Sequence, residues 1–86
     1  MSKSEKRLDR LCRKPPPTDI RWDEFVGILE SLGFTLHEHG GSHKFFVREV
    51  DGTEVRINTC RPHPNGIMKS YQIKEVVAKL DEWGLL

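Results

Sequence analysis

His43 is the residue of this sequence whose neighbours are best suited to support catalysis. It lies in the stretch HGGSHKFF at residues 39–46. An imidazole whose unperturbed pKa is about 6.5 can accept or release a proton near neutral pH. Gly40-Gly41-Ser42 would let the backbone approach a phosphate closely, and its N–H groups can form a nest that holds an anion. Lys44 adds positive charge beside the histidine. The pattern indicates acid–base chemistry at a phosphate; the alternative is a surface histidine in a flexible loop between two strands.

An acid–base reaction at a phosphate needs a second proton-transfer group, and His63 in the stretch RPHPNG is the candidate partner. Lys44 and Arg61 could instead stabilise negative charge electrostatically. The alternative for His63 is structural, as a ring hydrogen-bonded within a proline-rich loop or as a contact for a partner protein. The sequence leaves these roles open.

His37 and His39 offer a rival site, because residues two apart on a strand point to the same face. With His43 or Cys60 they could form part of a metal site. No paired Cys-x-x-Cys or His-Glu-x-x-His supports that site, so two solvated histidines are the favoured interpretation. We therefore expect no metal and no other cofactor, and we expect Cys60 to be a small packed residue rather than a nucleophile.

These residues must be positioned by helices and strands that the apolar pattern predicts. Apolar residues recur at helical spacing over residues 22–32 and 73–83, and each stretch is followed by a glycine. Trp22 and Trp83 are in phase with these stripes and are expected in the core. A short leading helix with a narrow apolar stripe precedes a proline elbow at residues 15–17.

Three segments between the two main helices have strand character, namely FTLHEH, KFFVREV and TEVRIN. Asp51-Gly52 joins the last two and predicts a hairpin. A two-residue loop would pair Arg48 with Val55 and put charge against the core, so we expect a three-residue loop over residues 50–52. The expected pairs are then Val47 with Val55, Phe45 with Ile57, and Arg48 with Glu54 on the edge or outer face.

This order of elements predicts an α+β fold, with a three-stranded antiparallel sheet and two helices packed on one face. The opposite sheet face is expected to be exposed to solvent. Residues 1–17, which include the short leading helix, are expected to form a basic extension. Residues 18–86 are expected to form the domain.

The composition of the 86 residues, 36% hydrophobic and 31% charged, is typical of one small soluble domain. No apolar run approaches the roughly 20 residues that cross a bilayer, and the N-terminus lacks the apolar segment of a signal peptide. Two distant cysteines do not indicate a disulfide scaffold, so a reducing cytoplasm is the expected location. Residues 1–17 carry a net charge of +4 and the rest −3, so the extension is either an anion-binding arm or a solubilising tail.

Three stretches carry a resemblance to a known family: WDEFVGILESLGF, then GGSHKFF, then INTCRPHPNGIMKSYQIKEVVAKLDEWGLL. Together they resemble the HicA toxins of bacterial toxin–antitoxin systems over about residues 20–86. The Gly-Ser-His triplet stands where that family has it, after a helix ending in Gly-Phe and one short strand.

The resemblance implies a double-stranded-RNA-binding-like fold and a ribosome-independent endoribonuclease acting on mRNA, a stress-response toxin silenced by a HicB antitoxin. It implies that His43 is catalytic and that the antitoxin covers the face around it, with no membrane or small-molecule partner. His63 falls near a second family histidine, and nothing transfers to residues 1–17. In this interpretation Phe46 stacks on a base. The expected RNA-binding residues are Gly41, Ser42, Lys44, Phe46, Arg48, Arg56, Arg61 and Lys69.

Two functions from different classes are compatible with this sequence. One is a metal-independent endoribonuclease using His43, and the other is an RNA-binding module without catalysis. A net charge of only +1 argues against tight backbone binding, which depends on Lys and Arg. An enzyme tolerates weak binding better than a recognition module does, so the charge balance favours catalysis.

Overall fold

The computed structural model describes residues 3–15, 17–38, 43–60, 62 and 66–86, with the side chains of 3–5 and 7 excepted. The elements run in the order α1 (Lys3–Leu11), α2 (Trp22–Ser31), β1 (Thr35–Glu38), β2 (His43–Val50), β3 (Thr53–Cys60) and α3 (Ser70–Glu82). The strands form one antiparallel sheet in the order β1-β2-β3. The predicted α+β fold with a three-stranded sheet is confirmed.

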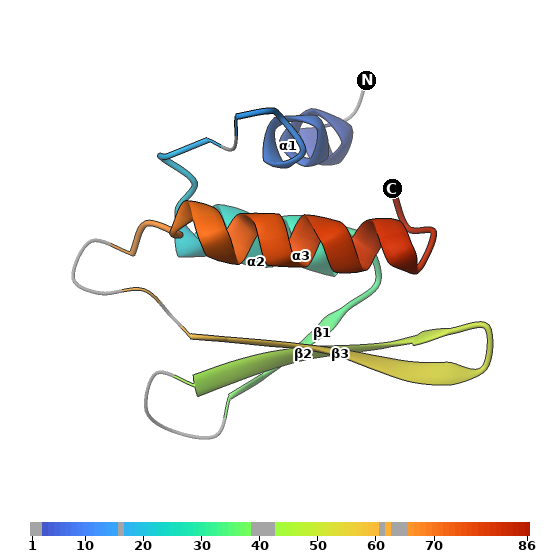
Figure 1. Cartoon of the computed structure of the whole chain (residues 1–86). Coiled ribbons are helices and arrows are strands. Elements are labelled where there is room, and N and C mark those ends of the chain that lie inside the picture. The colour runs from blue at the N-terminus through green and yellow to red at the C-terminus, as the bar shows by residue number, and fades with distance from the viewer. Residues whose placement is uncertain (1–2, 16, 39–42, 61, 63–65) are drawn as a thin grey trace.

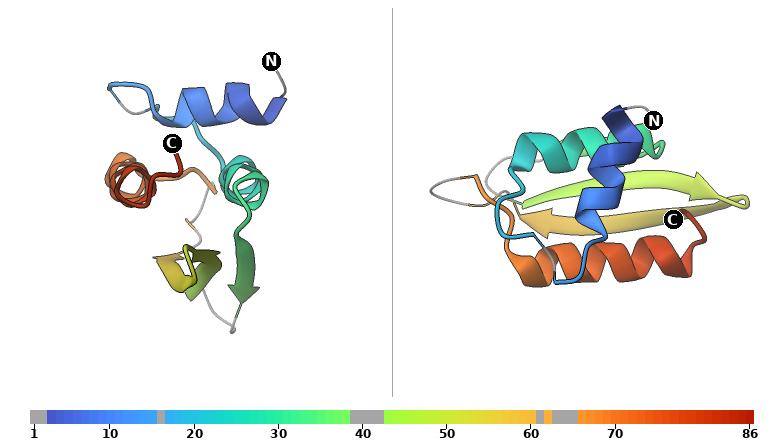
Figure 2. Two further views of the ribbon diagram at one scale, coloured as in Figure 1. Left: turned by 90° about the vertical axis from the view of Figure 1, so that its right-hand side faces the viewer. Right: turned by 90° about the horizontal axis from the view of Figure 1, so that it is seen from above.

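The elements stack in three layers, with the sheet below, α2 and α3 side by side above it, and α1 across the top of both helices (Figure 1; Figure 2). Only the upper face of the sheet is covered by helices. Among the described residues, no helix or strand lies against the lower face, which we call the outer face.

The core lies between the helices and the sheet and uses the predicted stripes. Phe25 of α2 and Phe46 of β2 are both fully buried, and their rings meet edge to face with centroids 5.7 Å apart. Trp22 packs 6.0 Å from each of them and is 5% exposed, so its predicted core position is confirmed. Trp83 is partly buried and packs against the same cluster. Each buried aromatic contributes about 1.5–3 kcal/mol through its apolar area.

The predicted three-residue hairpin loop is wrong. Val50 pairs with Thr53, so Asp51 and Gly52 alone form the turn, with φ angles of 50° and 81°. Positive φ at both positions is what a two-residue turn of this hand requires, and an Asp-Gly pair supplies it. This register places Phe46 opposite Ile57 on the core-facing side, both of them buried.

The error came from the expectation that Arg48 would avoid the core-facing side. Arg48 lies opposite Val55 on that side, near the end of the sheet, and its guanidinium Nη1 donates a hydrogen bond to the carbonyl of Leu32. Leu32 caps α2, and the next residue, Gly33, adopts a left-handed φ of 92° against the guanidinium. A cation at a helix C-terminus satisfies a free carbonyl and suits the helix dipole. The charge is therefore accommodated without entering the apolar core.

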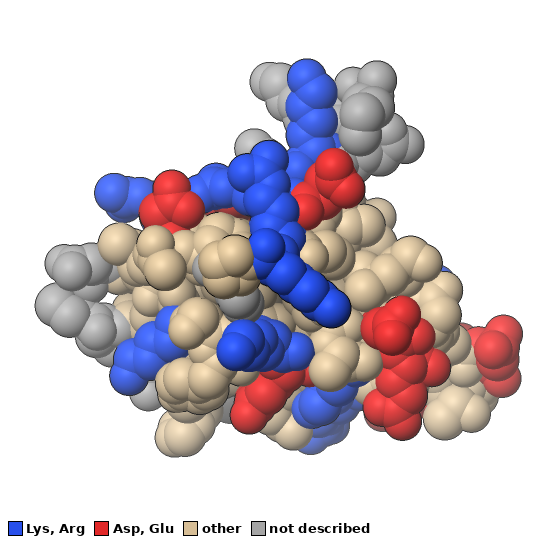
Figure 3. All heavy atoms as spheres, turned by 45° about the horizontal axis from the view of Figure 1, so that its top comes forward, with Lys and Arg blue, Asp and Glu red and all other residues tan. Residues whose placement is uncertain are grey.

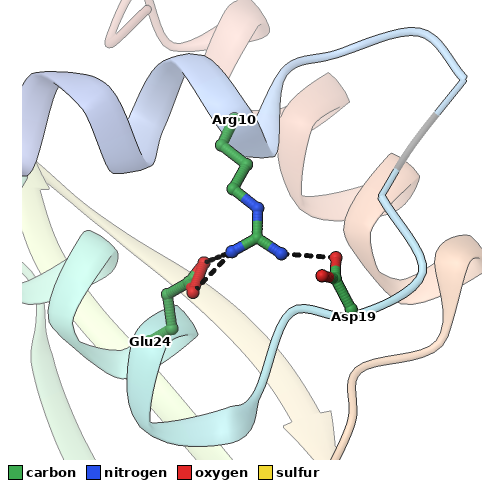
Figure 4. A network of polar contacts seen from close by, with 3 residues as sticks. All are labelled: Arg10, Asp19 and Glu24. Atoms are coloured by element: carbon green, nitrogen blue, oxygen red, sulfur yellow. Dashed lines mark hydrogen bonds and ion pairs between the residues drawn. The ribbon is translucent and has the colours of Figure 1, made fainter.

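Helix α1 is tied to the rest of the chain by apolar side chains and by one arginine. Leu11 is 1% exposed and belongs to the same buried cluster as the helices and strands below. Arg10 Nη1 lies 2.8 Å and 2.9 Å from the two carboxylate oxygens of Glu24 in α2, and Nη2 bonds Asp19 (Figure 4). The hydrogen bond to Asp19 and the charges of both carboxylates raise the pKa of Arg10 further above its ordinary value.

The face that carries α1 is of mixed charge. Among the described side chains, basic groups on this face lie beside carboxylates (Figure 3). Arg10, one of the six basic residues of the extension, is already engaged with two acidic residues of the chain itself.

Candidate active site

His43 is the first residue of β2 and its side chain is exposed on the outer face. Its cross-strand partner is Cys60, the last residue of β3, and the Sγ atom lies 3.5 Å from Nδ1 of the imidazole. That distance is within hydrogen-bond reach for sulfur, and the donor depends on the histidine tautomer. The contact fixes one ring nitrogen of His43 and directs the ring.

Cys60 is in turn held by the first turn of α3. Gln72 donates a hydrogen bond from Nε2 to the backbone carbonyl of Cys60 over 3.4 Å. The Oε1 atom of the same side chain accepts from the backbone N–H of Lys69 over 3.1 Å. One glutamine therefore links the end of β3 to the start of α3, and it stabilises the strand end that faces His43.

A hollow of about 320 Å³ opens beside His43. Residues of the two paired strand ends line it: His43, Lys44, Phe45, Asn58, Thr59 and Cys60. Its lining combines one imidazole, one thiol, one amide and one aromatic ring. Such a hollow is large enough for one planar group beside the histidine.

The burial of Phe46 does not agree with its predicted role of stacking on a base. Phe46 is fully buried between the sheet and the helices, so its ring cannot reach a ligand. Its neighbour Phe45 lies on the outer face instead, with the His37 ring stacked on it at 5.0 Å and 5°. The Arg56 guanidinium carbon lies 4.3 Å from the centroid of the same ring. The register error caused this exchange, because shifting a strand by one residue reverses both of its faces.

Of the other predicted RNA-binding residues that the structure describes, only Lys44 lies directly beside His43. Arg48 lies on the core-facing side and is engaged with α2, which corrects its expected place opposite Glu54. Arg56 is exposed on the outer face, and Lys69 is exposed at the start of α3 with Nζ 6.0 Å from the ring of Tyr71. Lys44 lines the hollow, although it follows His43 on the strand and so starts from the opposite face. Gly41, Ser42, Arg61 and His63 lie outside the described residues.

The structure describes only some of the candidate ligands of the rival metal site. His37 is stacked on Phe45, and His39 lies outside the described residues. Within the part of the chain that the structure describes, no three His, Cys, Asp or Glu side chains lie close enough to hold a metal ion. None of the helices in that part is long and apolar enough to cross a membrane.

The residues of this site lie in a part of the chain that matches a known protein family. The family model for the HicA toxin of bacterial toxin–antitoxin systems matches residues 22–83. The chain belongs to the HicA toxin family. The resemblance noted in the sequence is thereby confirmed. Comparison with curated proteins and with solved structures gives no significant match.

The HicA region includes α2, the whole sheet and α3, and so it includes His43, Cys60 and the hollow. Helix α1 precedes the matched residues, although Leu11 contributes to the same buried cluster. In this HicA family member the additional helix therefore packs on the helical side of the domain, away from the face that carries His43 (Figure 1).

Sequence reasoning missed three residues around the site. Cys60 was expected to be merely packed, yet it is the contact of His43. Nothing in the sequence singled out Gln72, because its hydrogen bond to Cys60 joins two separate elements. Phe45 could have been found from the hairpin alone, because an Asp-Gly turn of two residues pairs Phe46 with Ile57 in the core and so leaves Phe45 on the opposite face.

Proposed function

We propose that this HicA family toxin is a metal-independent endoribonuclease that cleaves mRNA with His43 as its proton-transfer residue. The observation that supports the proposal most is the exposed imidazole at the rim of a hollow, with Nδ1 against the Cys60 thiol. This arrangement leaves Nε2 as the ring nitrogen that can meet a substrate. Family membership supplies the toxin role, and the exposed histidine supplies the chemistry.

The reaction that suits this site is transesterification within the RNA. A base takes the proton of the ribose 2′-hydroxyl, the 2′-oxygen bonds to phosphorus, and the bond from phosphorus to the 5′-oxygen breaks. An acid protonates the departing 5′-oxygen, so the products are a 2′,3′-cyclic phosphate and a free 5′-hydroxyl. No water, oxidant or reductant is consumed. A neutral imidazole can supply the base, and an imidazolium can supply the acid.

The Cys60 contact decides which of these roles the free nitrogen of His43 can take. If Nδ1–H donates to sulfur, Nε2 carries a lone pair and acts as a base. If the thiol donates to Nδ1, the ring is neutral with its proton on Nε2 and cannot act as the base; the acid is the imidazolium, in which Nδ1–H again donates to sulfur. His63 is the proposed second proton-transfer group, with Lys44 and Arg61 as proposed electrostatic stabilisers of the phosphorane charge.

Regulation follows from where His43 lies. The outer face carries the site and, among the described residues, is free of helices, so a HicB-like antitoxin can inhibit the toxin by covering it. Production of the toxin alone is expected to arrest growth, and the two proteins are expected to co-purify when produced together. Harmless high-level production of the unmutated toxin by itself would contradict this role.

Cleavage of a defined mRNA in excess EDTA tests the proposal. The purified protein is compared with His43→Ala and with Glu49→Gln, a matched control at the far, exposed end of β2. We expect the control to match the wild type and His43→Ala to lose about 10²- to 10⁴-fold in rate, which is the usual contribution of a general acid or base. The 5′ fragment should end in a cyclic phosphate. If all three proteins bind RNA and none cuts it, the chain is an RNA-binding module without catalysis.

A further inference from the structure

A stack of three planar side chains crosses the outer face, one from each strand. The imidazole of His37 in β1 lies parallel to the ring of Phe45 in β2, at 5.0 Å and 5°. The guanidinium of Arg56 in β3 lies over the same ring, 4.3 Å from its centroid. Since β1 and β3 flank β2 on opposite sides, the two groups approach Phe45 from opposite directions. We call His37, Phe45 and Arg56 the outer-face stack.

The outer-face stack is exposed where an ordinary aromatic cluster would be buried. His37 and Arg56 are exposed and Phe45 is partly exposed, whereas Phe46 on the other face is fully buried. Planar π-faces and guanidinium planes at a protein surface are the groups on which unpaired nucleobases stack. Cross-strand pairing alone would stabilise the sheet, but it does not require a cation or an imidazole at these positions.

The stack lies directly beside the proposed catalytic residue. Phe45 follows His43 by two residues on β2, so both side chains leave the same face about 7 Å apart along the strand. The hollow of about 320 Å³ is lined by both residues. Asn58, which is exposed and opposite Phe45 in the register, lines it as well. Its amide carries both donors and an acceptor for the edge of a base.

Charge along the outer face also favours an anionic polymer at this end. Arg56 belongs to the stack, while Glu49 and Glu54 face each other near the hairpin turn and are both exposed. Asp51 adds a further carboxylate in the turn. A phosphate chain would therefore be repelled from the hairpin end.

We propose that the outer-face stack, together with Asn58, is a nucleobase-binding subsite for single-stranded RNA. A base of a nucleotide adjoining the cleaved phosphate stacks on the outward plane of the Arg56 guanidinium or of the His37 imidazole, both of which Phe45 holds in place, and its sugar and phosphate then lie at His43. RNA is the occupant by virtue of the proposed function of the site. A protein partner on the same face is the competing occupant, since aromatic and arginine side chains are also enriched at protein interfaces, and the test below separates the two.

Base stacking can be measured without cleavage. The full chain carrying His43→Ala is titrated into a single-stranded oligoribonucleotide that contains 2-aminopurine, whose fluorescence is quenched on stacking. Phe45→Leu is introduced in this background, and Phe45→Trp serves as the conservative rescue. Thr35→Ala is the control, because Thr35 is exposed and precedes His37 by two residues on the same face. Thermal unfolding of each variant reports whether it is folded. If Phe45→Leu is not folded, Arg56→Met is used in its place.

We expect the background protein, the Thr35→Ala control and the Phe45→Trp rescue to quench the probe. Phe45→Leu should lose the quenching and bind about tenfold more weakly, the usual scale for one stacked base. Equal quenching and equal affinity in Phe45→Leu would overturn the subsite. Unchanged RNA binding with lost binding of the antitoxin would also overturn it, and would assign the stack to the protein partner.

Cleavage and stacking can fail separately. If the unmutated protein cuts RNA, Phe45→Leu alone retains the same KM, and Phe45→Leu in the His43→Ala background retains the same quenching, the subsite is wrong and the nuclease stands. If no cleavage occurs but quenching still depends on Phe45, the nuclease is wrong and the subsite stands.

Discussion

Phe45 and Phe46 are the same residue type at neighbouring positions of one strand, and they lie in opposite environments. Phe46 is fully buried and packs against Trp22 and Phe25, so its ring contributes to stability. Phe45 is partly exposed between an imidazole and a guanidinium, beside the proposed catalytic histidine. The two faces of one sheet therefore divide the work, because the period of two in a strand sends adjacent side chains to different environments.

The largest difference between the two faces is expected from alanine substitution of each phenylalanine. Phe46→Ala leaves a cavity in the core and should lower the free energy of unfolding by about 3–5 kcal/mol. Phe45→Ala removes only cross-strand contacts and should cost about 1 kcal/mol or less. Urea unfolding of both variants, followed by tryptophan fluorescence, measures the difference. Equal losses would show that the outer-face stack is a second core rather than a binding surface.

Leu11 extends the comparison to the layer above the helices. Because it is 1% exposed within the shared cluster, Leu11→Ala should cost about 2–5 kcal/mol. Leu86, which is 50% exposed, is the matched control, and Leu86→Ala should change stability by less than about 0.5 kcal/mol. A single cooperative transition in both variants would show that α1 unfolds with the HicA region. A separate early transition would show that the extension is only loosely attached.

The two arginines of the hairpin provide a smaller contrast. Arg48 bonds the carbonyl at the end of α2, so Arg48→Met should lower the free energy of unfolding by about 1–2 kcal/mol. Arg56 lies on the outer face, and Arg56→Met should cost less than about 1 kcal/mol. Thermal unfolding of the two variants compares them directly. A larger loss for Arg56 would reverse the assignment of the faces.

The smallest effect is expected at Cys60 and should fall on activity rather than stability. Cys60→Ala removes the contact with Nδ1 of His43 and should reduce kcat about two- to tenfold, the scale of one hydrogen bond. Cys60→Ser retains a donor and an acceptor at this position and should restore most of the rate. KM should change little in either variant, because the contact orients the imidazole and does not touch the substrate. Equal activity of Cys60→Ala and the wild type would show that the contact does not position His43.

The elements of the fold were predictable because each one is encoded locally. The apolar stripes of α2 and α3, the glycines that end them and the Asp-Gly hairpin turn all involve residues within a few positions of one another. The register was mispredicted because burial of Arg48 was judged without the C-terminus of α2. The carbonyl that Arg48 bonds at that C-terminus belongs to Leu32, sixteen residues away in the sequence, so no local rule could include it.

The candidate site divides in the same way between local and distant information. The sequence by itself determined that His43 directly follows Gly40-Gly41-Ser42, and family membership follows from the order of its motifs. Only the tertiary structure decided that Cys60 faces the imidazole, that Gln72 holds Cys60, and that Phe45 rather than Phe46 joins the site. The physical reason is that these contacts join separate strands and helices, and they exist only once the hairpin register and the packing of α3 bring those elements together.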